Sequence, residues 1–150
     1  MGRILGVDPG EKNIGLALSD PTGMISTPLR VIKHVSRNED AKAIAGIAAE
    51  NEALKIVIGQ ALGSEGEVGP AAVQSARLAD CVRQFFSGEV ILWDESGSTN
   101  AVKDIYLTIG VRKNKRRGHL DARAAAYILQ DYLNWQSYQK PAAEENENDG

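Results

Sequence analysis

Residues 4–19 read ILGVDPGEKNIGLALS, and this stretch predicts two short strands joined by a tight polar turn. Its first four residues form an apolar run, as expected of a strand that is buried on both faces. Pro9 and Gly10 end that strand, because glycine adopts turn conformations at little steric cost. Apolar and small residues then alternate over 14–19, which is typical of a strand packed on one face. The stretch therefore predicts a hairpin at the start of the fold.

Asp8 is the unusual residue of this hairpin, because a carboxylate at the end of an apolar strand is costly unless it is paired or bound to a cation. One interpretation is an aspartate that caps the turn by accepting backbone N–H groups. The other is a metal ligand or an acid–base group on a rigid strand end, where functional sites are often built. This stretch by itself leaves both interpretations open.

The rest of the chain predicts three more strands and four helices. A third strand over 25–32 contains Pro28, and a proline inside a strand indicates the edge of a sheet. The later elements are a helix that begins at Ser36, a strand over 55–58, a helix over 70–86, a strand over 90–93, and helices over 99–109 and 120–138. Strands reached through helical crossovers should run parallel to the first strand. We therefore predict an α/β fold with a mixed five-stranded sheet, three strands antiparallel and then two parallel, flanked by helices.

Length and composition describe one ordinary globular domain of 150 residues, with 43% hydrophobic and 25% charged residues. We expect the domain to cover residues 1–138 and residues 139–150 to form a disordered acidic tail. No apolar run approaches the length of a membrane span. Cys81 is the only cysteine, which excludes an intrachain disulfide and suits a cytoplasmic protein. The spacing of Cys81 from Leu78 and Val82 favours a buried structural thiol.

The net charge of −3 comes from the predicted tail. Four of the 20 acids lie at positions 144–149, which leaves 16 acids against 17 basic residues in the rest of the chain. The domain is therefore close to neutral, and the acidic overall balance does not argue against a nucleic-acid partner.

Carboxylates are predicted to meet at one edge of the sheet. Asp8 follows the first strand, while Asp94 and Glu95 follow the fifth, and the carboxyl ends of parallel strands share an edge. Asp121 begins the last helix on its predicted buried face, with Ala124, Ala125, Ile128, Leu129 and Tyr132. Each acid has a structural alternative, either capping a helix or complementing its dipole. Several carboxylates together would repel one another without a cation, and an all-oxygen site suits Mg²⁺ or Mn²⁺.

The order of elements, together with GVDPG at 6–10, Asp94-Glu95 and DARAAAYILQDYL at 121–133, resembles the YqgF (RuvX) family over residues 3–133. The resemblance implies an RNase H-like fold related to the RuvC resolvases. It also implies a nuclease for Holliday junctions or for the 5′ end of pre-16S rRNA, with Asp8, Glu95 and Asp121 as catalytic metal ligands. The chain departs from the family pattern at Gln60, where the family usually has leucine, and at Ser96, where it usually has arginine.

A basic segment at 112–117 contains five basic residues in six positions. It is either a solvated charge run or a set of phosphate contacts beside the metal site. The predicted nucleic-acid-binding residues are Lys12, Arg112, Lys113, Lys115, Arg116 and Arg117. His119 reads as a polar loop residue, and the sequence shows no partner for His34.

We predict a metal-dependent phosphodiesterase that acts on structured RNA or branched DNA, is not bound to membranes, and is compatible with a homodimer. One alternative is a non-catalytic nucleic-acid-binding module with the same fold. Another is an actin-like ATP-binding protein, but such proteins need two lobes and a second phosphate loop. Glu65 and Glu67 compete with Glu95 as the second acid, because they follow the fourth strand, which should neighbour the first. We favour Glu95 because it directly follows a strand, whereas Glu65 and Glu67 lie in a glycine-rich loop.

Overall fold

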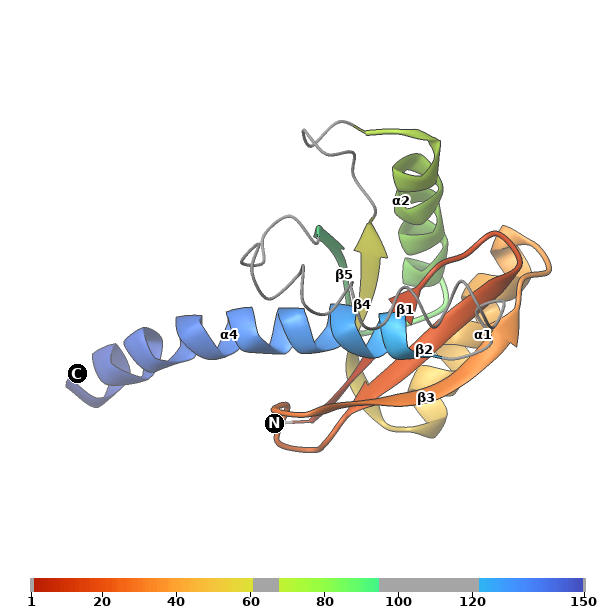
Figure 1. The fold of residues 1–150 in the computed structure, drawn as a ribbon. Helices are drawn as coiled ribbons and strands as arrows, with labels where there is room; N and C mark the ends of the chain where they lie inside the picture. The colour runs from red at the N-terminus through yellow and green to blue at the C-terminus, as the bar shows by residue number, and fades with distance from the viewer. Residues whose placement is uncertain (1, 61–67, 95–121, 150) are drawn as a thin grey trace.

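The structure is a computed structural model that describes residues 2–60, 68–94 and 122–149 (Figure 1). Its strands are β1 (Arg3–Asp8), β2 (Asn13–Ser19), β3 (Ser26–Lys33), β4 (Ala53–Gln60) and β5 (Glu89–Asp94). Its helices are α1 (Arg37–Glu50), α2 (Pro70–Arg83) and α4 (Arg123–Asp149). The helix predicted over 99–109 lies outside the described residues.

The five strands form one sheet in the order β3-β2-β1-β4-β5. β1 pairs antiparallel with β2 and parallel with β4, and β4 pairs parallel with β5. This confirms the predicted mixed sheet. β3 lies at an edge, as Pro28 indicated, and the register of the β2–β3 pair shifts where Pro28 meets Ala17. An edge position with an irregular register accommodates a residue that cannot donate to the ladder.

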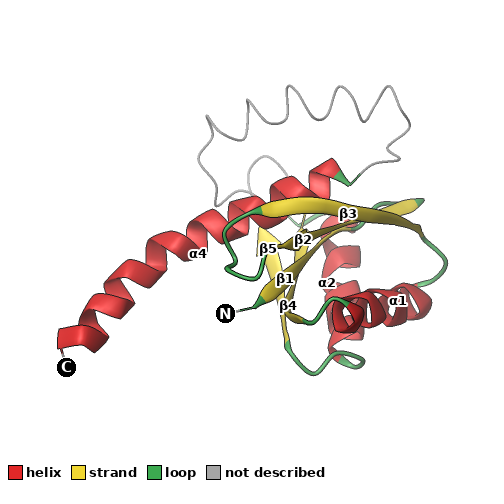
Figure 2. Cartoon of the chain, turned by 90° about the horizontal axis from the view of Figure 1, so that it is seen from below, coloured by secondary structure: helices red, strands yellow, loops and turns green. Residues whose placement is uncertain are grey.

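The sheet separates two hydrophobic cores. Leu5 and Val7 of β1 join the core under α1 and α2, whereas Ile4 joins the core under α4. Figure 2 shows α1 and α2 on one side of the sheet and α4 on the other. Because successive strand residues point to opposite faces, the apolar run at the start of the chain serves both cores.

α1 begins as the sequence predicts. Ser36 is the N-cap, and its side chain accepts a hydrogen bond from the amide of Glu39 at 3.2 Å. Ala41 and Ile44 are fully buried on the face that packs against the sheet, and Asp40 is buried beside them. Cys81 of α2 is half-buried rather than buried as predicted, and its Sγ lies 3.8 Å from Asn38 Oδ1 near the start of α1.

α4 packs over β1 and β2 through much of the face that the sequence predicted. Ala125, Ile128, Leu129 and Tyr132 are buried, as predicted, but Ala124 is half-buried and Ala126 is buried instead. The helix continues past the predicted end near residue 138 to Asp149, so residues 139–149 of the predicted tail are helical.

No helix of the described ranges is long and apolar enough to cross a membrane.

Candidate active site

Three strands end together at one edge of the sheet. β1 ends at Asp8, and its preceding residue Val7 is in register with Ile58 of β4. Gln60 ends β4 and is in register with Asp94, the last residue of β5. The edge predicted to carry the site therefore exists, and Asp8 and Asp94 are its described carboxylates. Both residues are half-buried.

Two glycines bring α4 close to this edge. A Cβ placed on Gly6 would lie 2.7 Å from the Cβ of Leu129, and one placed on Gly59 would lie 2.6 Å from Cδ1 of Ile128. At Gly6 the contacts are with the Cβ of Leu129 and the carbonyl oxygen of Ala125, so glycine is required there for the helix to lie at this separation. The indole N–H of Trp93 in β5 also donates to Asp131 Oδ2 at 2.9 Å. The first turns of α4 are thereby fixed over the strands that carry the site (Figure 1).

A cavity of about 570 Å³ opens beside Asp8, and we call it the Asp8 cavity. The β1–β2 turn forms one wall and includes Glu11. The junction of β3 with α1 contributes His34 and Arg37, and the first turns of α2 contribute Gln74. Its volume lies within the range of about 300–1,000 Å³ that is usual for ligand pockets. The carboxylate of Asp8 and the guanidinium of Arg37 therefore line the same cavity.

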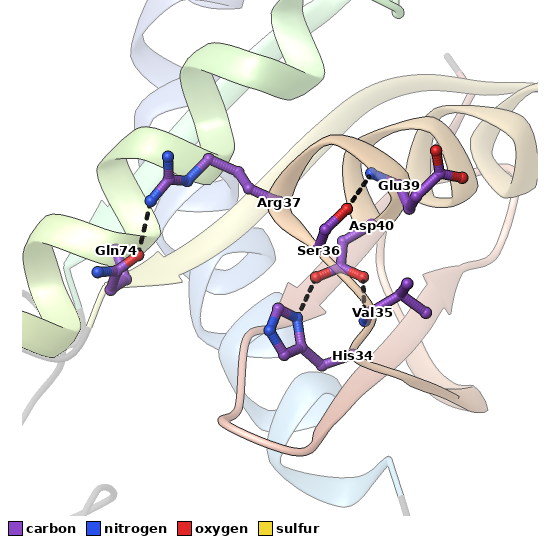
Figure 3. Close-up of polar contacts among 7 residues, drawn as sticks. All are labelled: His34, Val35, Ser36, Arg37, Glu39, Asp40 and Gln74. Carbon is purple, nitrogen blue, oxygen red and sulfur yellow. Dashed lines mark hydrogen bonds and ion pairs between the residues drawn. The ribbon is translucent and has the colours of Figure 1, made fainter.

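His34 is held by a carboxylate on the wall of the Asp8 cavity (Figure 3). Its Nδ1 makes a short contact with Oδ2 of Asp40, and the side chain of Asp40 is 4% exposed. Oδ1 of Asp40 accepts the amide N–H of Val35 at 2.9 Å. The backbone amide of His34 donates to the carbonyl of Lys12 at 2.9 Å, which ties this wall to the β1–β2 turn. The imidazole therefore has a fixed orientation.

Arg37 joins the first turn of α1 to α2. Its Nη2 donates to Oε1 of Gln74 at 2.9 Å (Figure 3). Both side chains are exposed and line the Asp8 cavity. An arginine held by a neutral amide keeps its full positive charge, so this wall attracts anions.

The structure describes two of the predicted site residues. Asp8 lines the Asp8 cavity, and Lys12 is exposed in the β1–β2 turn. The other predicted site residues lie outside the described residues: Glu95, Asp121, Arg112, Lys113, Lys115, Arg116 and Arg117. The competing acids Glu65 and Glu67, the departure at Ser96, and His119 also lie outside them. Within the described ranges, no three His, Cys, Asp or Glu side chains are grouped to hold a metal ion.

Sequence reasoning missed the partners of His34 and the cavity wall formed by Arg37 and Gln74. A signal for Asp40 exists, because it precedes Ile44 by four residues and Ile47 by seven and so falls on the buried helix face. A carboxylate at such a position needs a partner, and His34 supplies it. The departure at Gln60 also has a structural role, because its Nε2 donates to the carbonyl of Ala72 at 3.3 Å.

Two solved structures share the fold of this chain. T. thermophilus RuvC in complex with a Holliday junction substrate superimposes with a TM-score of 0.59 at 11% identity, covering 93% of this chain and 98% of that one. The Fowlpox virus resolvase in complex with substrate Holliday junction DNA gives 0.54 at 16% identity, covering 89% and 98%. The predicted RNase H-like fold is confirmed by these two likenesses.

Sequence comparison identifies the family. Two relatives named "Putative pre-16S rRNA nuclease" come from Halothermothrix orenii and Myxococcus xanthus. The first is 34% identical over 90% of this chain and 96% of its own length, and the second is 37% identical over 87% of each. The RuvX family model, described as Holliday junction resolvase, matches residues 2–135. The chain therefore belongs to the RuvX family.

Proposed function

We propose that the chain is a divalent-metal-dependent nuclease that hydrolyses phosphodiester bonds of structured nucleic acid. The observation that carries this proposal is the position of Asp8, a carboxylate at the carboxyl end of β1 that lines a cavity to which Gly59 of β4 and Ile128 of α4 also contribute. Family membership and the nuclease names of the relatives support the same reaction. The single cysteine suits catalysis in the cytoplasm.

Asp8, Glu95 and Asp121 are the proposed ligands of Mg²⁺ or Mn²⁺. In the sequence, Glu95 directly follows Asp94, the last residue of β5, and Asp121 comes two residues before α4 begins. Carboxylate oxygens are the donors that these hard cations prefer, so the donor set fits the metal. The bound ions would supply charge stabilisation and an activated water for an in-line displacement.

The residues of the chain would position the strand for this reaction. Asp8 is fixed by its strand, and the close approach of α4 through Gly6 fixes the helix that follows Asp121. Lys12, which is exposed in the β1–β2 turn, would contact a phosphate near Asp8. The proposed further phosphate contacts are Arg112, Lys113, Lys115, Arg116 and Arg117. Such contacts supply affinity without sequence specificity, so the substrate would be recognised by its shape.

A cleavage panel tests the proposal. The full chain is incubated with a four-way DNA junction and with an RNA that carries the 5′ end of pre-16S rRNA, in Mg²⁺, in Mn²⁺ and in EDTA. We expect one of the two substrates to be cut in at least one metal and neither in EDTA. Binding without cleavage in both metals would contradict the proposal and leave a non-catalytic nucleic-acid-binding module.

The same assay identifies the second acid. We expect Glu95→Gln to lower the cleavage rate by at least about 100-fold, because residues that only support metal ligands already change activity by about 10- to 100-fold. Glu65→Gln and Glu67→Gln make the same charge change in the glycine-rich loop and should keep the parental rate. Loss of cleavage in either loop variant, with an active Glu95→Gln, would place the second ligand after β4 instead.

A further inference from the structure

Arg37 presents an unneutralised positive charge to the Asp8 cavity. Its guanidinium bonds the neutral amide of Gln74, and none of the ion pairs of the described residues includes it. A guanidinium has five N–H donors, and the bond to Gln74 occupies one of them. Most of its hydrogen-bonding capacity therefore remains for an anionic ligand.

A hydrogen bond to Gln74 orients Arg37 before any ligand binds. The bond to Gln74 spans 37 residues of sequence and joins the first turns of two helices. A side chain that is already ordered loses less conformational entropy on binding, which favours affinity. Because Nδ1 of His34 is turned to the buried Asp40, the Nε2 edge of the ring lies away from Asp40 (Figure 3). Arg37 and His34 thus form one polar wall of the Asp8 cavity.

Three carboxylates line the cavity: Asp8 and Glu11 lie in or beside the β1–β2 turn, and the buried Asp40 contacts His34. Among the described lining residues Arg37 is the one lysine or arginine, so an anion that enters the cavity is favoured beside Arg37. The first turn of α2 on that side has no acidic residue, so its helix dipole adds to the positive potential there. A guanidinium fork matches the geometry of a phosphate group and can bind it with two parallel hydrogen bonds.

We propose that Arg37 binds a phosphate of the nucleic-acid strand that enters the Asp8 cavity, and that His34 contacts the same strand beside it. The proposal rests on the proposed function, since the strand is the substrate of that nuclease. Arg37 then holds a phosphate of the same strand that reaches Asp8, because both residues line the Asp8 cavity. Gln74 is the positioning residue for Arg37.

Two variants test the charge of Arg37 in different ways. Arg37→Gln removes the positive charge. Gln74→Glu keeps the arginine and its hydrogen bond but places a carboxylate beside the guanidinium, which neutralises its charge. We expect each to weaken binding by about 10- to 100-fold, as for loss of a charged hydrogen bond, and to lower the salt slope by about 0.7 to 0.9. Gln74→Ala keeps the charge and should weaken binding less than Gln74→Glu. Arg77→Gln is the matched control, because Arg77 is an exposed α2 arginine outside the cavity lining, and it should bind as the parent.

Binding is measured by fluorescence anisotropy against salt concentration, with a four-way DNA junction and a stem–loop RNA as probes. All variants carry Asp8→Asn and are kept in EDTA, so that binding is read without cleavage, and thermal unfolding confirms that each is folded. If the parent cuts nothing but this order of affinities holds, the phosphate site stands and the nuclease proposal fails. If Arg37→Gln and Gln74→Glu bind like Arg77→Gln, or if the Asp8→Asn chain binds neither probe, the phosphate site is wrong.

Discussion

Asp8→Asn should lower the metal-dependent cleavage rate by at least about 100-fold, while the chain stays folded. The substitution preserves the size of the side chain and removes one negative charge from the edge where the strands end. Loss of a residue that supports a metal ligand lowers metal affinity or activity by about 10- to 100-fold. Loss of the ligand itself should lower the cleavage rate at least as much. Because the side chain keeps its size, the unfolding temperature in EDTA should stay close to that of the parent.

The decisive measurement for Asp8 is unfolding temperature against Mn²⁺ concentration. A ligand that binds only the folded state raises the unfolding temperature, so the parent should be stabilised by Mn²⁺ and Asp8→Asn should not. Asp80→Asn is the matched control, since Asp80 is exposed on α2 and pairs with Arg83 at 2.6 Å, away from the Asp8 cavity. It should retain both cleavage and the response to Mn²⁺. An Asp8→Asn chain that cuts as fast as the parent would show that the metal mechanism is wrong.

Gly6→Ala should destabilise the protein by about 1–3 kcal/mol and reduce cleavage, because it forces α4 away from the sheet. The added Cβ would lie 2.7 Å from Leu129 Cβ and 3.3 Å from the carbonyl oxygen of Ala125. Both atoms are rooted in the helix backbone, so rotating a side chain cannot relieve the contact. The expected fall in unfolding temperature is roughly 2–12 °C for a chain of this size. Cleavage should fall as well, because Asp121 is proposed to act from the start of that helix.

Gly46→Ala makes the same chemical change and should have the opposite effect on stability. Gly46 lies in α1, and a Cβ placed there meets nothing within 4 Å. Alanine in an open helix position should stabilise the protein by about 0.5–1 kcal/mol and leave cleavage unchanged. Both variants are measured by thermal unfolding and by the cleavage assay. Equal unfolding temperatures for the two variants would show that α4 is not held against β1 through Gly6.

The elements of this fold are readable from the sequence because their signals are local. The apolar run before Asp8 predicts a central strand, Pro28 predicts an edge strand, and Ser36 predicts a helix start, and all three are confirmed. Periodicity and turn chemistry act over a few residues, so one sequence contains them in full. Right-handed crossovers then predict parallel strands, which brings the ends of β1, β4 and β5 to one edge.

Contacts between elements distant in sequence were decided by the tertiary structure. Arg37 meets Gln74 across 37 residues, and Gly6 meets Leu129 across most of the chain. Neither contact leaves a periodic trace, because the first depends on how α1 and α2 pack together on one face of the sheet and the second on how α4 packs against β1 on the other face. His34 and Asp40 are only six residues apart, yet the contact depends on the turn from β3 into α1 and on the burial of Asp40. The sequence by itself determined which strand end carries Asp8. Only the packing of the elements decided that a cavity with a charged arginine opens beside Asp8, because cavities form where side chains of separate elements do not fill the space between them.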